Sequence, residues 1–250
     1  MELWEAVALL GAGMAAGAIN AVVGSGTLIT FPTLLAFGYA PVLANVTNNI
    51  GVLPGSVSGA WAYRRELAGQ KSRVMRLAGA SLAGGIVGAI LLLKLPESAF
   101  EAIVPVLILL AVLLVILQPK LRGLLAKREH APAHGGRTAL AVTGLTGVYG
   151  GYFGAAQGVL LTAFLGILLD DDLQRINALK NVLSGLVNFV AAIVFVAVSD
   201  VAWGAAAVIA AGSTIGGQVG GMYGRKLPSV ALRGVVVVVG TVAAVRLLLT

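Results

Sequence analysis

The residues whose types and spacing suit anion binding are small and amide residues that lie inside hydrophobic sequence. Gly24-Ser25-Gly26-Thr27 leads directly into a short apolar run that contains Pro32 and ends at Gly38. Glycine lets the backbone turn and expose its N–H groups, and a helix N-terminus adds a partial positive charge. The stretch therefore predicts a site for a small anion that needs no full cation. The alternative is that these glycines only break or pack helices.

The same features return 132 positions later, because Gly26-Thr-Leu-Ile-Thr30 aligns with Gly158-Val-Leu-Leu-Thr162. The other pairs in this register are Ser25 with Gln157, Asn45 with Asn177, Asn49 with Asn181, and Lys94-Leu95-Pro96 with Lys226-Leu227-Pro228. Chance apolar similarity would not match Asn, Lys and Pro in one register. The pattern indicates a two-fold internal repeat, which in a membrane chain favours a transporter built from two halves.

Amide side chains follow each glycine stretch and form a second group of candidate binding residues. Asn45, Thr47, Asn48 and Asn49 lie in the first repeat, and Asn177, Lys180 and Asn181 in the second. Asparagines four positions apart share a helix face and can donate to an oxyanion. The alternative is hydrogen bonding between helices, worth about 1 kcal/mol.

Lys180 stands where the first repeat has Asn48, and it breaks the symmetry between the repeats with a charge. We expect its ammonium to contribute to the anion site. The alternative is a lysine that snorkels toward Asp170–Asp172.

The positions of the ionisable residues exclude several function classes. All ten acidic residues lie at segment ends or in loops, both histidines (His130 and His134) lie in a polar loop, and there is no cysteine. A cation site or proton relay within a membrane usually needs an embedded carboxylate, so a neutral or anionic substrate is favoured. Without a nucleophile–base set or a ligand cluster, we expect neither an enzyme nor a metal site or cofactor.

Composition places the chain in a membrane. It is 58% hydrophobic and 11% charged, whereas a soluble domain carries about 25% charged residues. We predict an all-α integral membrane protein with about eight full transmembrane helices. The long segments are 3–23, 41–63, 77–94, 98–118, 138–155, 173–198, 201–224 and 230–249. The short runs 27–37 and 159–169 are predicted to be broken or re-entrant segments.

Basic residues indicate the topology. The loops at 64–76 and 119–137 are basic and are predicted to be cytoplasmic, whereas the loop at Ser199-Asp200 has no basic residue and the loop at Arg225-Lys226 has two. Basic loops thus exchange places between the repeats, which predicts inverted repeats. The alternative is a parallel duplication. The predicted units are a first repeat (1–118), a linker (119–137) and a second repeat (138–250). The net charge of +7 follows from this topology rather than from nucleic-acid binding.

The chain resembles the TauE/SafE family of sulfite and organosulfonate exporters over nearly its whole length. The resemblance is carried by Asn20-x-x-x-Gly24-Ser-Gly-Thr-Leu-Ile-Thr-x-Pro32, Thr47-Asn48-Asn49, Gly55-Ser56-Val57-Ser58 and Tyr63-Arg64-Arg65. It implies a multi-pass inner-membrane transporter of small anions such as sulfite or sulfoacetate. Family members often have Thr-Asn-Lys where this chain has Thr47-Asn48-Asn49, and a lysine near Asn181, where this chain has Lys180.

We predict alternating access around a midplane site, with export as the favoured direction. The candidate substrate-binding residues are Asn20, Gly24, Ser25, Gly26, Thr27, Asn45, Thr47, Asn48, Asn49, Gln157, Gly158, Asn177, Lys180 and Asn181. The alternatives are a non-transporting membrane subunit or scaffold, and an uptake permease for another small anion. The expected partners are the anion, the lipid bilayer and a possible second copy of the chain.

Overall fold

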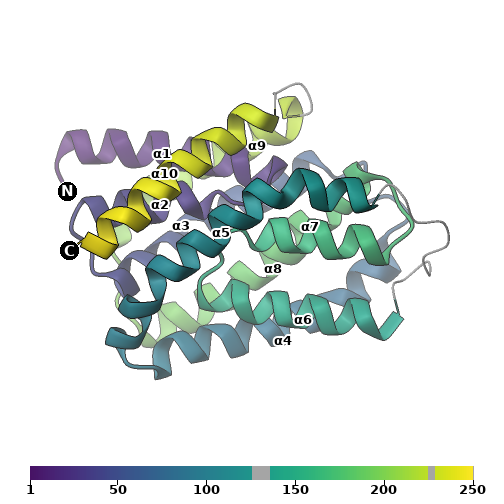
Figure 1. The fold of residues 1–250 in the computed structure, drawn as a ribbon, viewed down its shortest axis with the longest axis horizontal. Coiled ribbons are helices and arrows are strands. Elements are labelled where there is room, and N and C mark those ends of the chain that lie inside the picture. Colours follow the sequence, from purple (N-terminus) through teal and green to yellow (C-terminus); the bar gives the residue numbers. More distant parts are fainter. Residues whose placement is uncertain (126–135, 225–228, 250) are drawn as a thin grey trace.

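A computed structural model describes residues 1–125, 136–224 and 229–249. Within these residues every regular element is a helix, as the composition predicts (Figure 1). The helices are α1 (Leu3–Val22), α2 (Thr27–Ala36), α3 (Pro41–Ala62), α4 (Lys71–Lys94), α5 (Glu97–Leu125), α6 (Gly136–Tyr152), α7 (Gln157–Leu168), α8 (Leu173–Val198), α9 (Trp203–Tyr223) and α10 (Ser229–Leu249).

Five of the described helices are long and apolar enough to cross a membrane. They are Leu3–Val22, Lys71–Lys94, Leu173–Val198, Val230–Leu249 and the stretch Glu97–Lys120 of α5. The two short apolar helices, α2 and α7, have 10 and 12 residues, so each is too short to span by itself. The predicted short segments are therefore present. The total of eight spans stays a prediction.

Several element boundaries differ from the sequence-based prediction. Helix α4 begins at Lys71 rather than at residue 77, so the predicted loop 64–76 is helical from Lys71 onward. Helix α5 continues through Pro119 to Leu125, so the predicted linker 119–137 begins inside a helix, and residues 126–135 lie outside the described part. Helix α2 is continuous through Pro32 rather than broken there. Proline removes one backbone donor, and a helix packed among neighbours tolerates that loss.

Glycine faces hold two pairs of helices together. A Cβ atom added at Gly13 of α1 would lie 2.8 Å from the carbonyl oxygen of Ile209 in α9, and one at Gly216 would overlap the carbonyl oxygen of Met14. In the same way Gly84 and Gly88 of α4 lie against the backbone of α6. Such close approach is the usual role of small residues in membrane helix pairs.

The helices α3 and α8, which the 132-residue shift relates, run in opposite directions. In the contact between α3 and α8, Ser56 lies near Asn188, whereas Gly59, farther along α3, lies near Asn181, earlier in α8. In Figure 1, α1 begins at the left end of the molecule and α6 begins at the right end. The shift also exchanges contacts, since α1 packs on α9 and α6 packs on α4.

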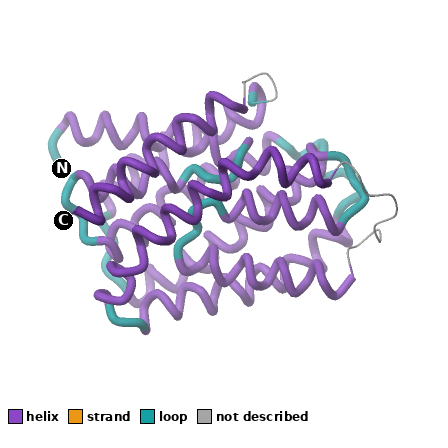
Figure 2. Tube along the Cα trace, viewed as in Figure 1, coloured by secondary structure: helices purple, strands orange, loops and turns teal. Residues whose placement is uncertain are grey.

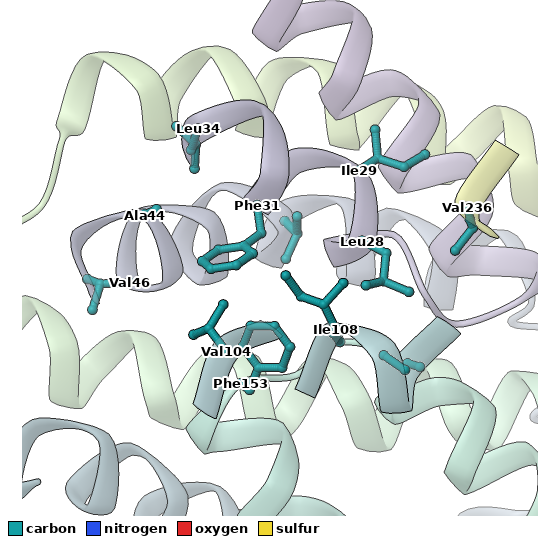
Figure 3. Close-up of a cluster of buried hydrophobic side chains, with 14 of the residues drawn as sticks. Leu28, Ile29, Phe31, Leu34, Ala44, Val46, Val104, Ile108, Phe153 and Val236 are labelled. Atoms are coloured by element: carbon teal, nitrogen blue, oxygen red, sulfur yellow. The ribbon is translucent and has the colours of Figure 1, made fainter. Parts of the chain in front are cut away.

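The main hydrophobic core surrounds α2 (Figure 3). Leu28 and Phe31 of α2 face Val104 and Ile108 of α5, and all four side chains are buried. The rings of Phe31 and Phe153 form an edge-to-face contact with centroids 5.2 Å apart. Since Phe153 follows α6, the core fixes the short helix of the first repeat against the helix break of the second.

The glycine faces predict a substitution effect. Gly216→Ala should lower the melting temperature in detergent, because its methyl group overlaps the Met14 carbonyl, and such overpacking costs roughly 1–3 kcal/mol. Gly79→Ala is the matched control, since nothing lies within 4 Å of a Cβ atom at Gly79. Circular-dichroism melting checks both variants. Equal melting temperatures for the two would contradict the proposed role of the α1–α9 face.

Candidate functional site

The candidate site lies where the two helix breaks meet inside the bundle. Helix α1 ends at Val22 and α2 begins at Thr27, and in the second repeat α6 ends at Tyr152 and α7 begins at Gln157. Figure 2 shows both connections as loops in the interior of the bundle. The N–H of Gly158 donates to the carbonyl oxygen of Gly24 at 3.1 Å, so the breaks are joined directly.

The turn geometry explains why small residues are needed there. Gly24 has φ +90°, and a Cβ atom on it would lie 2.5 Å from the Cα of Gly158. Ala156, which the shift pairs with Gly24, also has a left-handed backbone, with φ 58°. An alanine rarely adopts this conformation unless the surroundings enforce it. Ala156 therefore has a strained backbone conformation in the connection between α6 and α7.

Asn45 and Asn177 perform the same task in the two repeats. The Nδ2 of Asn45 donates to the carbonyl oxygen of Tyr152 at 2.9 Å, and the Nδ2 of Asn177 donates to that of Ala21 at 3.0 Å. Both carbonyls belong to the last turn of a helix, where intrahelical partners are missing. Asn45 and Asn177 therefore form hydrogen bonds between helices, which was the alternative to anion binding.

Lys180 brings a positive charge to the same junction. Its side chain is 1% exposed, and its Nζ donates to the carbonyl oxygens of Asn20 at 2.8 Å and Ala21 at 3.2 Å. The Nδ2 of Asn181 also donates to Ala21, at 3.3 Å. An ammonium at the C-terminus of α1 is stabilised by the negative end of the helix dipole. The aliphatic stem of Lys180 lies beside Gly158.

The first repeat has a neutral arrangement at the equivalent place. Asn48 accepts a hydrogen bond from the hydroxyl of Thr30, and its Nδ2 lies 3.5 Å from Oγ1 of Thr27. The exchange of Asn48 for Lys180 therefore changes the binding partner. Asn48 binds the short helix of its own repeat, whereas Lys180 binds the C-terminus of α1.

Two buried donors at the helix breaks have no partner among the described residues. They are the hydroxyl of Ser25 and the side-chain amide nitrogen of Gln157, which the 132-residue shift pairs. By contrast, the first amides of the short helices are largely used within the turns, as in the bond from Leu28 to the Ser25 carbonyl. The N–H of Gly26 has only a long contact to Asn20, at 3.5 Å. The available donors for an anion are therefore side chains rather than the helix amides that the sequence suggested.

The other predicted residues lie around or outside this junction. Asn49 donates to Asn188 at 3.5 Å, and Asn188 donates to Ser56 at 3.3 Å, so these form a polar contact between α3 and α8. Thr47 accepts from the N–H of Ala202 at 3.2 Å and so caps the start of α9. Asn188 is not among the residues predicted from the sequence. Its position two helical turns after Asn181 places both on one face of α8 and could have indicated its role.

A carboxylate joins the two repeats at the basic end. Asp171 lies 2.5 Å from a guanidinium nitrogen of Arg73 in α4 and 2.7 Å from Nε of Arg175 in α8. Burial would raise the pKa of Asp171, but hydrogen bonds from Arg73 and the Asp172 N–H, with the charges of both arginines, lower that pKa below its usual value. Asp171 thus pairs with Arg73 and Arg175. The ammonium of Lys180 instead binds carbonyl oxygens at the end of α1.

Comparison with known proteins gives a family match over most of the chain. The family model described as sulfite exporter TauE/SafE matches residues 9–247. The probable membrane transporter protein YfcA of Escherichia coli (strain K12) is 27% identical over 94% of this chain and 86% of its own length. The probable membrane transporter protein ORF9 of a Sinorhizobium species is 28% identical over 93% and 88%.

A probable membrane transporter protein of Haemophilus influenzae is 27% identical over 83% of this chain and 80% of its own. No solved structure matches the chain.

The Asp171 cluster predicts a pH-dependent contribution to stability. Asp171→Asn should lower the free energy of unfolding by about 1 kcal/mol at pH 7. Because the folded pKa is depressed, this contribution is full above the unfolded pKa of about 4 and disappears as the pH falls through the folded value. Asp170→Asn, at an exposed neighbouring residue, is the control. Denaturant titration at pH 7 and pH 3 checks this, and an unchanged difference at pH 3 would contradict it.

Proposed function

The chain belongs to the sulfite exporter TauE/SafE family, and we propose that it exports a small oxyanion, sulfite or an organosulfonate such as sulfoacetate. Its similar relatives are named as membrane transporters, and the helices fit a multi-pass membrane protein. One observation carries the proposal. The unpartnered donors of Ser25 and Gln157 are buried at the two helix breaks, which Gly24 and Gly158 join, and the aliphatic stem of Lys180 lies against Gly158.

The proposed site binds charge through three side chains. The hydroxyl of Ser25 and the amide of Gln157 donate to the anion oxygens, and Lys180 supplies the opposite charge. A hydrogen bond to a charged group contributes about 1.5–3 kcal/mol. A tetrahedral or pyramidal oxyanion can accept from several directions at once, so it suits donors that come from both repeats. Asn181 keeps the C-terminus of α1 satisfied when Lys180 turns toward the anion.

Alternating access requires two halves that exchange roles, and the antiparallel course of α3 and α8 supports inverted repeats. In this proposal the unit of α1, α3 and α9 rocks against the unit of α4, α6 and α8, close to the contact between Gly24 and Gly158, so that each moving unit combines helices of both repeats. The site would face one side of the membrane and then the other, while the linker 119–137 stays on one side.

Export follows from charge and membrane potential. We place the basic ends of the helices, including the loops 64–76 and 119–137, in the cytoplasm, because basic loops face inward in bacterial inner membranes. An interior-negative potential of about 100 mV favours the exit of each anionic charge by about 2.3 kcal/mol. Export therefore needs no coupling ion. All acidic residues lie at segment ends or in loops, where they do not serve as an embedded proton relay.

Cysteine labelling tests the topology, since the chain has no native cysteine. Ser72→Cys and Lys226→Cys should react with an impermeant maleimide only from the cytoplasmic side, and Ser199→Cys only from the opposite side. The reason is that inverted repeats place both basic loops on one face. Labelling of intact cells and of inverted vesicles checks this. Cytoplasmic access to Ser199→Cys together with access to Lys226→Cys only from the opposite side would favour a parallel duplication.

Proteoliposome flux tests the function. The purified protein should release sulfite or a small sulfonate down an electrical gradient, and Lys180→Gln and Ser25→Ala should each slow release by about 10-fold or more, since each removes a bond to a charged ligand. Ser81→Ala is the matched control, because its hydroxyl is also buried and unpartnered but lies in α4.

Three outcomes would contradict the proposal in different ways. A folded protein that moves none of sulfite, sulfate and small sulfonates is a subunit or scaffold. Accumulation against the gradient would indicate an uptake permease. Equal flux in Ser25→Ala, Lys180→Gln and the Ser81→Ala control would place the site elsewhere.

A further inference from the structure

A polar pocket lies away from the helix breaks, at the basic end of the molecule. It has a volume of about 440 Å³ and lies between the end of α3 with its following loop and the last turns of α9. Its walls include Trp61, Arg64, Arg65, Gln218 and Met222. Because α3 and α9 come from different repeats, the pocket straddles the joint between the halves.

Trp61 and Arg64 form a preorganised cationic surface in this pocket. The Trp61 side chain is 64% exposed, and the guanidinium carbon of Arg64 lies 5.1 Å from the centroid of its ring. Arg64 also donates to the carbonyl oxygen of Trp61 at 3.1 Å. These two contacts fix the guanidinium while leaving most of its donors for a ligand. A planar guanidinium with free donors is well matched to phosphate oxygens.

The pocket carries a net positive charge. Arg64 and Arg65 are both exposed, and no ion pair in the described part of the chain uses either of them. Glu66 is the acidic residue of the lining, which leaves a formal charge of +1. At the same end of the molecule, Arg73 and Arg175 instead share the carboxylate of Asp171.

The position of the pocket distinguishes a lipid from a soluble anion. Trp61 lies in the last turn of an apolar helix, where tryptophan marks the membrane–water interface. Below it on α3, Val57 is 61% exposed, and Met222 on α9 is 54% exposed. These side chains provide an apolar path that leads from the arginines toward the bilayer core. A small soluble anion would not contact these apolar side chains, whereas the acyl chain of a lipid would pack against them.

We propose that this pocket binds the headgroup of an anionic glycerophospholipid. Arg64 and Arg65 contact the phosphate, the amide of Gln218 contacts the glycerol region, and the first acyl methylenes lie along Met222 and Val57. Through α3 and α9 the lipid contacts both repeats. This inference goes beyond the exported anion and is tested without transport.

Tryptophan fluorescence provides the test, because Trp61 can be made the sole tryptophan. Trp4 begins α1 and Trp203 begins α9, so both lie at the other end of the molecule, and both are replaced by phenylalanine. The protein is reconstituted in phosphatidylcholine with brominated phosphatidylglycerol or, separately, with brominated phosphatidylcholine. We expect phosphatidylglycerol to quench Trp61 at about a fivefold lower mole fraction, as for one basic side chain near an anionic headgroup.

Two variants separate the pocket from general surface charge. Arg64→Gln with Arg65→Gln should abolish the preference for phosphatidylglycerol, and Arg65→Gln alone should reduce it even if the double variant does not fold. Arg76→Gln removes the same charge from an exposed position on α4 outside the pocket, and it should leave the preference unchanged.

Other results would overturn the proposal. These are equal quenching by the two lipids, a loss of preference in Arg76→Gln as large as in Arg65→Gln, or full displacement by millimolar inorganic phosphate, which would identify a soluble oxyanion as the ligand.

Discussion

The backbone contact between Gly24 and Gly158 sets the arrangement of the rest of the molecule. Because no side chain fits between the two turns, the breaks of both repeats must lie at one point in the bundle. That contact leaves the C-terminal carbonyls of α1 and α6 inside the protein, where water does not satisfy them. Asn177 and Lys180 satisfy one end and Asn45 the other. The first role of the asparagine side chains in the apolar sequence is thus to bind the carbonyls that the two helix breaks leave without partners.

This requirement also determines which polar groups remain for a ligand. Most amides near the breaks already serve a carbonyl, and leaving a buried donor unpaired costs free energy, so unpaired donors are rare in native structures. Ser25 and Gln157 are such donors, and they occupy equivalent positions in the two repeats. In the proposed site, both donors would gain a partner when an anion binds.

The sequence predicts much of this arrangement because polar residues in apolar segments and repeats are visible without a structure. The all-helical fold and the two short segments follow from length and spacing. The individual bonds do not follow. Thr47 caps α9, and Asn49 pairs with Asn188. Neither contact could be predicted from the sequence, because both depend on how helices distant in the chain pack together. The extension of α5 through Pro119 was missed because local sequence alone does not fix where a helix ends.

The packing also limits how the molecule could move. Each glycine face joins the first helix of one repeat to the fourth helix of the other, and backbone atoms in contact leave no room for sliding. The pairs α1–α9 and α4–α6 are therefore the stiff parts. Between them, α3 meets α8 through the hydrogen bonds of Asn49, Asn188 and Ser56, which are 3.3–3.5 Å long and hence weak. Rocking of the α1–α9 pair against the α4–α6 pair would break fewest contacts at that polar interface, and the proposed motion therefore uses it.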